Sequence, residues 1–393
     1  MEKGKIYYPR ITIIGIGGGG GSVVSEICKS IKARRIPHAN KIKFVVANVD
    51  LQAIKNAPKQ ATAFSFGKEL THGLGCGMRP EIGERAALEA KPKIERLLKN
   101  NDICIFISSL GGGAGSGASP VFAKVARDLG VVSMGIFTKP FSFEGKERAK
   151  IAEKSLKTLK PFLNAVSVIP NQRIFKIVDQ NTPVNKSLSA MNKILVDILE
   201  GLIETLYLPG LINLDFSDLK AMMDTEKSLT YLHSQVFSGK NRAEKALSNV
   251  LKNPLINYDI KQADRILFNI IGSKDLKMTE IAGLCDKIIS FNSSAKIIFG
   301  VGQDNKYKNR LKITLMAVGC EKKKKKKIIK KKVTKKPKPE KKPKKTKKKS
   351  NKKEKQKKTV RKNALDLHKE AEQDMQEMLE QESKWDVPTF LRE

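Results

Sequence analysis

Residues 110–119 of the chain read LGGGAGSGAS, with five glycines and no side chain larger than leucine. A second glycine run, GIGGGGGSVV, occupies residues 15–24. Each run follows a short apolar stretch typical of a buried β-strand and precedes a stretch typical of a helix. A glycine loop in that position lets backbone N–H groups and a helix N-terminus come close to an anion. The two runs therefore predict an anion site at the edge of an α/β sheet.

Strand and helix patterns alternate through the first part of the chain. Apolar strand patterns lie at residues 10–17, 42–50, 102–110, 131–138 and 165–170, and helical patterns at 22–33, 80–99, 120–130 and 146–160. We expect Ser22 to cap the first of these helices. This alternation predicts an α/β fold with a mostly parallel sheet, which binds its ligand outside the carboxyl ends of the strands.

Composition and periodicity divide the chain into seven predicted segments. They are an N-terminal Rossmann-like domain (1–183), one long central helix (184–206), a loop with its following helix (207–239), a smaller C-terminal α/β domain (240–320), a lysine-rich linker (321–362), a weak amphipathic helix (363–385) and a tail peptide (386–393). The linker carries 26 Lys and Arg against three acids, so we expect it to be disordered.

Charge and cysteine content restrict the class of protein. Much of the formal net charge of +36 belongs to the linker rather than to the folded domains. The linker is interpreted either as a solvated spacer or as a contact to anionic membrane or nucleic acid. Five scattered cysteines without a C-x-x-C pair indicate a reducing compartment. With no signal-peptide pattern and no long apolar run, we expect a cytoplasmic protein.

Two glycine runs at one sheet edge favour a nucleoside triphosphate over a diphosphate. There is no G-x-x-x-x-G-K-[ST] motif, which excludes the P-loop mechanism. Two alternatives remain open for the first run. It satisfies G-x-G-x-x-G, and Asp50 ends the next strand, so a dinucleotide-dependent oxidoreductase is one alternative. Tight packing of the helix on the strand is the other.

Several ordered motifs carry a family resemblance. GGGAGSG is similar to the tubulin signature GGGTG(S/T)G, and residues 10–319 resemble the tubulin/FtsZ family through ANVDLQAI, GLGCGMRPEIG, TKPFSFEGKER, IPNQRI and LINLDFSDLKAMM, in that order. The resemblance implies a tubulin-like GTPase that polymerises head-to-tail into filaments of the cytokinetic ring at midcell. It also implies GTP or GDP as ligand, with Mg²⁺ held on the phosphates rather than directly by protein ligands.

The same resemblance implies roles for individual residues. The glycines enclose the phosphates, Asn48 and Asp50 lie near the nucleotide and its Mg²⁺, and Asn171 binds the guanine base. Glu144 and Arg148 contact the ribose and phosphate side, although their i, i+4 spacing also fits a plain helix-surface pair. The full set of expected nucleotide-binding residues is Gly17, Gly18, Gly19, Gly20, Gly21, Asn48, Asp50, Gly111, Gly112, Gly113, Ala114, Gly115, Ser116, Gly117, Glu144, Arg148, Asn171, Leu188 and Lys193.

The expected catalytic residues lie in a different motif, NLDFSDL, which contains Asn213, Asp215 and Asp218. A carboxylate is suited to orient the water that attacks a bound triphosphate. The alternative interpretation is that Asp215 merely caps the following helix. In the tubulin architecture this loop lies at the pole opposite the nucleotide and completes the site of the next subunit. Such a heterologous contact does not close and therefore builds filaments.

Three positions depart from the family pattern. Ala114 replaces the signature threonine and removes a hydroxyl. Leu188 replaces the aromatic that faces the base, and Lys193 replaces an aspartate that reads guanine. A lysine cannot accept a hydrogen bond, and Asn192 takes this role only if the alignment is off by one residue. These departures predict weaker guanine selectivity, and they leave open a GTP-binding structural polymer with little hydrolysis.

The end of the chain suggests a partner. DVPTFLR, from Asp386 to Arg392, is similar to the short tail peptide by which FtsZ members of the family dock on membrane-tethering division proteins. Val387, Phe390 and Leu391 supply apolar groups for a groove, and many tethered copies gain affinity by multivalency.

Overall fold

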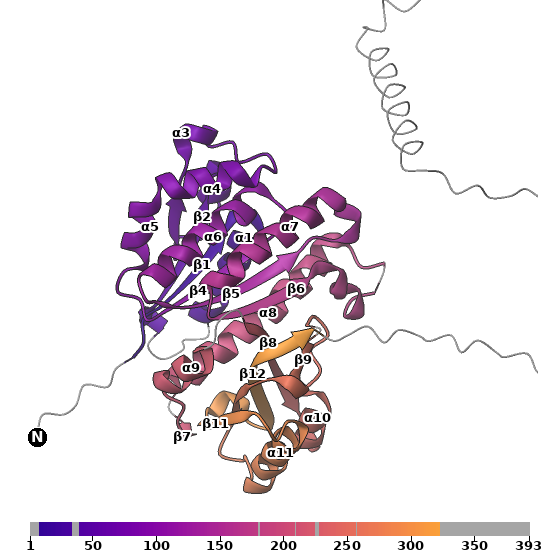
Figure 1. Ribbon diagram of the computed structural model, residues 1–393. Coiled ribbons are helices and arrows are strands. Elements are labelled where there is room, and N and C mark those ends of the chain that lie inside the picture. Colours follow the sequence, from indigo (N-terminus) through magenta and orange to yellow (C-terminus); the bar gives the residue numbers. More distant parts are fainter. Residues whose placement is uncertain are drawn as a thin grey trace, which may run out of the picture. The chain divides into compact units, whose positions relative to one another are not determined.

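The computed structural model describes residues 8–322, apart from 34–38, 180, 209, 225–227 and 257 (Figure 1). The described residues all belong to one compact unit. The predicted amphipathic helix and tail peptide, and the linker from residue 323 on, lie outside the described residues.

The N-terminal part of the sheet is parallel, as the alternating pattern predicts. Its strands follow the order β3 (Thr62–Ser65), β2 (Ile42–Asn48), β1 (Ile11–Ile16), β4 (Ile103–Ser109), β5 (Val132–Lys139) and β6 (Ala165–Pro170). Every neighbouring pair in this series is parallel. Strands β1 and β4 are almost entirely buried, which explains why they read as continuous apolar runs rather than alternating ones.

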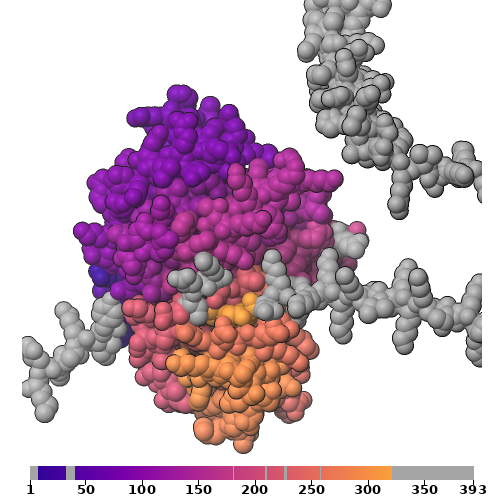
Figure 2. Space-filling view, viewed as in Figure 1, coloured from indigo at the N-terminus to yellow at the C-terminus, as the bar shows by residue number. Residues whose placement is uncertain are grey.

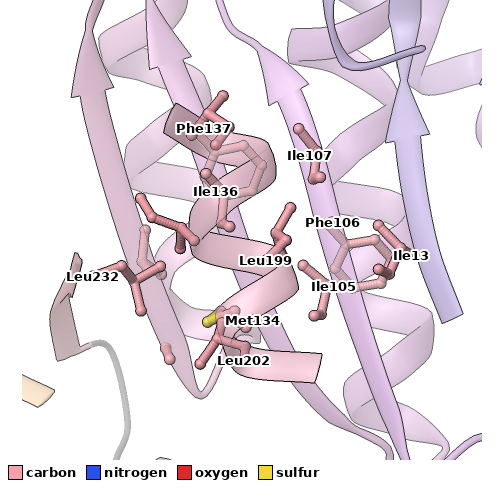
Figure 3. Close-up of a cluster of buried hydrophobic side chains, with 14 of the residues drawn as sticks. Ile13, Ile105, Phe106, Ile107, Met134, Ile136, Phe137, Leu199, Leu202 and Leu232 are labelled. Atoms are coloured by element: carbon pink, nitrogen blue, oxygen red, sulfur yellow. The ribbon is translucent and has the colours of Figure 1, made fainter. Parts of the chain in front are cut away.

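The helices of this lobe are α1 (Gly17–Ala33), α2 (Leu51–Lys55), α3 (Lys68–Thr71), α4 (Pro80–Glu89), α5 (Lys91–Leu98), α6 (Gly113–Asp128), α7 (Lys146–Leu159) and α8 (Val184–Tyr207). Helices α1, α2 and α6 pack on the sheet, and α4, α5 and α7 pack on α6. Figure 3 shows Leu199 and Leu202 of α8 beside Ile105 and Met134 of the sheet, in a continuous apolar core. The central helix predicted at 184–206 is thus confirmed within one residue.

The structure corrects three predicted helix boundaries. Helix α1 begins at Gly17, so Ser22 is not its cap; the Ser22 hydroxyl instead donates to the Gly18 carbonyl, 3.1 Å away, inside the helix. Helix α6 begins at Gly113 rather than at Pro120, so most of the second glycine run is helical. The helix expected at 80–99 is two helices, because Pro92 cannot continue the first and instead lies in the opening turn of the second.

The C-terminal part continues the same sheet. Its strands follow the order β8 (Ser228–Ser238), β12 (Arg310–Lys322), β10 (Arg265–Gly272), β11 (Lys296–Gln303) and β7 (Gly210–Ile212). Strand β6 pairs with β8 through Ala165 and Ser228, so one sheet runs through both lobes. The sequence pattern does not predict strand β8, and β12 extends to Lys322, two residues into the segment predicted as linker.

The remaining helices of the second lobe are α9 (Phe216–Met223), α10 (Arg242–Asn249) and α11 (Met278–Phe291), with the short strand β9 (Tyr258–Asp259) beside β12. Figure 2 shows the two lobes in contact along a continuous surface. Helix α8 joins them, because it packs on α1 in the first lobe and on β8 and β12 in the second. No helix among the described residues is long and apolar enough to cross a membrane.

Candidate nucleotide site

Both glycine runs reach the same edge of the sheet. Gly17 follows β1 directly, Gly112 stands between β4 and α6, and Asn48 is the last residue of β2. Because β1, β2 and β4 are parallel neighbours, their carboxyl ends meet. One cavity there is lined by residues of both runs and of four further segments: Gly17, Gly18, Gly19, Asn48, Val49, Asp50, Ala53, Gly75, Cys76, Ser109, Leu110, Gly112, Gly113, Ala114, Gly115, Pro140, Glu144, Arg148 and Asn171.

The glycines of the two runs fall into two groups. In the larger group a Cβ atom would collide with the protein itself: at Gly20 it would lie 2.2 Å from the Ile107 carbonyl oxygen, and at Gly117 it would lie 1.9 Å from that of Pro80. At Gly18 and Gly112 a Cβ atom would meet nothing within 4 Å. Packing thus explains most of these glycines, as the second alternative held. It does not explain Gly18 and Gly112, which face the cavity.

Five of the expected phosphate-site residues do not line this cavity. They are the buried residues Gly20, Gly21, Gly111, Ser116 and Gly117. The Ser116 hydroxyl accepts a hydrogen bond from the Gly111 N–H at 2.8 Å and shapes the turn into α6. These residues therefore shape the backbone around the cavity and do not line it. The start of α6 has Gly112 as its N-cap without any side-chain hydrogen bond, so the first N–H groups of the helix face the cavity unblocked by a capping side chain.

Asn48 and Asp50 shape the loop after β2. The buried Asn48 side-chain oxygen accepts from the N–H of Val49 at 2.9 Å and of Asp50 at 3.3 Å. The Asp50 carboxylate caps α2 by accepting from the N–H of Gln52 at 2.8 Å and of Ala53 at 3.3 Å. Asp50 thus caps α2 through Oδ1 alone, and it also lines the cavity.

Glu144 and Arg148 form the ion pair that their spacing predicts, with Arg148 Nη1 2.8 Å from Glu144 Oε2. The other Glu144 oxygen, Oε1, accepts from the Phe141 N–H at 2.8 Å. Both side chains also line the cavity, so the helix-surface pair and the expected binding position coincide. The pair presents one positive and one negative group at the cavity wall.

Asn171 provides an unsatisfied acceptor. It is the first residue of the 3₁₀ turn Asn171–Lys176 after β6, and its side-chain oxygen is buried with no hydrogen-bond partner among the described residues. A buried acceptor without a partner costs roughly 1–3 kcal/mol, so a ligand N–H at this position restores stability. The Asn171 oxygen therefore fits a ligand that donates from a ring edge.

A second cavity continues from the first past Gly17, Gly18 and Asn48. It is lined on one side by α1 and on the other by α8, with Ser22, Ser25, Glu26, Lys29, Ser189 and Asn192. Leu188 and Lys193, which are expected to bind the nucleotide, line neither cavity. Each residue of a helix is turned by about 100° from the next, so a shift of one position along α8 moves a side chain away from α1.

Sequence reasoning missed the polar face of α1. Ser22, Ser25 and Lys29 are spaced three and four residues apart, which places them on one side of the helix. This spacing is typical of a surface helix as well as of a binding face. The proximity of α8, which turns this face into a cavity wall, could not be read from the spacing.

The expected catalytic loop lies at the opposite edge of the sheet. Asn213 and Asp215 are exposed, and Asp218 is half-buried. The helix that follows them, α9, buries Leu219 and Met223 against an apolar cavity that Ile11 and Ile103 also line. Because Ile11 and Ile103 are the first residues of β1 and β4, α9 lies at the amino ends of the strands. The three side chains do not line the cavity of their own subunit.

Within this loop Asp215 caps α9, as the alternative interpretation held. Its Oδ1 accepts from the Asp218 N–H at 2.8 Å, and Asp218 Oδ2 accepts from the Asp215 N–H at 3.1 Å. Asn213 Oδ1 accepts from the Gly210 N–H at 2.6 Å. A hydrogen bond from the Ser217 hydroxyl, with smaller contributions from Asp218, lowers the pKa of Asp215 below its usual value. The cap and the exposed carboxylates are compatible, since a cap uses one oxygen.

In the described part of the chain, no three His, Cys, Asp or Glu side chains gather to hold a metal ion. The fold and the site together define a nucleotide-binding protein of the tubulin-like α/β class, with the nucleotide cavity and an acidic loop at opposite edges of one sheet.

Comparisons with known proteins agree with this class. Residues 10–179 match the model of the Tubulin/FtsZ family, GTPase domain, and residues 233–321 match that of the FtsZ family, C-terminal domain. The chain belongs to the tubulin/FtsZ family and is a GTPase. The Cell division protein FtsZ of Wigglesworthia glossinidia brevipalpis is 33% identical over 311 residues, which are 79% of each chain. That of Coxiella burnetii is 32% identical over 312 residues, covering 79% of this chain and 78% of the relative.

Solved structures show the same relationship. The FtsZ dimer of M. jannaschii has a TM-score of 0.72 and 31% identity, over 81% of this chain and 93% of that one. The GTPγS-bound protofilament of CetZ2 from Haloferax volcanii has a TM-score of 0.68 over 79% of this chain and 93% of that one; at 18% identity it shows a shared fold.

Proposed function

We propose that the protein is a filament-forming GTPase of cell division, which hydrolyses GTP at the contact between successive subunits. One observation carries the proposal: the cavity with the two glycine runs and the acidic loop of Asn213, Asp215 and Asp218 lie at opposite edges of the sheet. A single copy cannot bring them together. Two copies stacked head-to-tail can, and a contact between unlike surfaces repeats without closing.

The cavity residues fit a guanine nucleotide. The open spaces at Gly18 and Gly112 leave room for phosphate oxygens against the backbone. The buried Asn171 oxygen accepts a hydrogen bond from the base, whose ring N–H and amino group are donors in guanine. Asn192, which lines the neighbouring cavity, supplies a second amide at the place expected for Lys193. An amide both donates and accepts, so guanine recognition does not need a carboxylate here.

Mg²⁺ belongs on the phosphates in this proposal. Mg²⁺ commonly keeps several waters and binds through substrate phosphates with few protein ligands. When bound, the ion neutralises charge on the β- and γ-phosphates.

The chemistry assigned to the loop is the orientation of water. In the stacked pair, Asp215 and Asp218 of one subunit accept hydrogen bonds from a water beside the γ-phosphate held by the other. The water oxygen forms a bond to the γ-phosphorus while the bond to the bridging oxygen of GDP breaks, and the proton leaves with phosphate. Asn213 donates through its amide NH₂ group, because its oxygen is already bonded to the Gly210 N–H.

Exposed apolar side chains stand near both proposed contact surfaces. Leu74 and Phe143 neighbour cavity residues in the chain and are 86% and 71% exposed. Leu211, beside Asn213, is 70% exposed, and Ile212 is 45% exposed. Large exposed apolar groups of this kind mark interaction surfaces when they cluster. Burial of both sets in one head-to-tail contact supports filament formation.

A role at the division site follows the names of the relatives, which are called cell division proteins. We extend it to the tail, where the peptide from Asp386 to Arg392 docks on a membrane-tethering partner and the lysine-rich linker acts as a charged spacer. Polymer pelleting with liposomes, with and without residues 386–393, tests this part. Equal recruitment of both forms in the presence of the tether would contradict it.

Complementation between two inactive variants tests the shared site. Asp215→Ala keeps an intact cavity, and Gly112→Val keeps an intact loop. Mixed in equal amounts, about a quarter of head-to-tail contacts join an intact cavity to an intact loop. We expect phosphate release in the mixture to exceed that of either variant alone and to rise with protein concentration. A mixture no more active than its components, together with a parent whose activity per subunit ignores concentration, would mean a self-contained site.

A further inference from the structure

The acidic loop is ordered by its own hydrogen bonds before any neighbour arrives. Asp215 Oδ1 accepts two of them, from the Asp218 N–H at 2.8 Å and from the Ser217 hydroxyl at 2.6 Å. Asp218 Oδ2 accepts the return bond from the Asp215 N–H. Each carboxylate therefore uses one oxygen inside the loop.

The second oxygen of each carboxylate is left for a ligand. Among the described residues, neither Asp215 Oδ2 nor Asp218 Oδ1 takes part in a hydrogen bond or ion pair. Asp215 is exposed, and an exposed carboxylate held by a single bond samples several rotamers. Two donors on the same oxygen select one rotamer and thereby fix the direction of the other oxygen.

We propose that Ser217 is a positioning residue for hydrolysis: its hydroxyl holds Asp215 so that Oδ2 points out of the loop toward the water of the neighbouring subunit. The inference rests on the proposed role of Asp215. Ser217 itself is exposed, and its hydroxyl bonds to no other described residue. Its removal therefore affects Asp215 with little effect on packing.

The hydroxyl has a second consequence for Asp215. A protonated carboxyl group loses acceptor strength, so a donor on Oδ1 stabilises the charged form, in agreement with the lowered pKa of Asp215. A carboxylate with a lowered pKa is a weak base. Its part in the reaction is then to accept a hydrogen bond from the water and orient it, while the proton passes to the phosphate.

The test compares Ser217→Ala with Ser217→Thr, which keeps a hydroxyl, by the pH dependence of phosphate release per pelleted subunit. For Ser217→Ala we expect kcat to fall by about 3- to 10-fold, the loss of one hydrogen bond, with KM for GTP unchanged. We also expect the acid limb of the profile to move to higher pH. Ser217→Thr restores both. Ser248→Ala, which removes an exposed hydroxyl on α10, is the matched control and leaves the profile unchanged.

The outcomes separate the two proposals. If Ser217→Ala keeps the parental kcat and acid limb while Asp215→Asn is inactive, the role of Ser217 is refuted and the proposed function stands. If Ser217→Thr behaves as Ser217→Ala, the hydroxyl is not the cause and the inference also fails. If Asp215→Asn itself retains full activity, the proposed function is refuted.

Discussion

Replacement of Lys312 by methionine tests what holds α8 to the second lobe. Glu204 of α8 is fully buried, and its Oε2 lies 2.7 Å from Nζ of Lys312, which is 2% exposed. Its Oε1 accepts from Lys306 at 2.8 Å, and the Tyr307 hydroxyl lies 3.2 Å from both oxygens. Burial raises the pKa of Glu204, but the charges and hydrogen bonds of Lys312 and Lys306 outweigh it, so the pKa is lowered. The carboxylate is therefore buried and charged.

The expected cost follows from this burial. Lys312→Met leaves a buried carboxylate with its main partner gone, which costs about 3–5 kcal/mol. Lys306→Met is the matched control: Lys306 is 35% exposed, so water replaces much of its interaction and we expect about 1 kcal/mol or less. Removing both charges, in Glu204→Leu with Lys312→Met, is expected to recover most of the loss, because buried pairs are often replaced by apolar groups without penalty.

Thermal unfolding of the full-length protein measures the effect. At about 2–4 °C for each kcal/mol, Lys312→Met lowers Tm by roughly 10 °C and Lys306→Met by a few degrees at most. The reasoning is refuted if Lys312→Met melts within 2 °C of the parent. It is also refuted if the double variant melts below Lys312→Met, since the unpaired carboxylate would then not be the source of the loss.

Three further predictions follow from single positions. Gly112→Ala folds normally but binds GTP about tenfold or more weakly. Gly117→Ala has a lower Tm, because its Cβ overlaps the Pro80 carbonyl. Melting curves and nucleotide titration distinguish the two variants. Asn192→Leu reduces the preference for GTP over ATP by about 10-fold or more in competition with labelled GTP, while Lys193→Leu leaves it unchanged. Burial lowers the pKa of His233 to about 4, so below pH 6.5 the folded state binds fewer protons than the unfolded state. The free energy of unfolding is therefore highest above pH 6.5 and falls by about 3 kcal/mol toward pH 4. Urea unfolding of His233→Phe is expected to show a smaller fall.

The sequence by itself determined the elements with strong apolar patterns. Strands β1, β4 and β6 and the central helix α8 have bounds within one or two residues of those predicted. Continuous β-branched runs or a long 3.6-residue period leave little freedom in these segments. The motif set also sufficed to indicate the family and most of the residues that line the cavity.

Tertiary contacts decided the helix starts. Glycine is a poor helix former, so the sequence predicts Gly17 and Gly113 in loops, whereas they are the first residues of α1 and α6. At Gly113 a Cβ atom would lie 2.5 Å from the Cys76 Cβ, so close packing and not helix propensity accounts for glycine at this position. Propensity is a local quantity, and the free energy of this close packing comes from residues distant in the chain.

Tertiary structure also decided which site residues meet. Asn192 rather than Lys193 lines the cavity because of the rotation of α8 about its axis relative to α1. A motif alignment gives no information about that rotation. Topology places Asp215 at the amino ends of the strands and Gly112 at the carboxyl ends. A linear sequence specifies which groups are present, but the distance between them depends on how strands and helices pack. Here that packing puts the nucleotide cavity and the acidic loop at opposite ends of the strands.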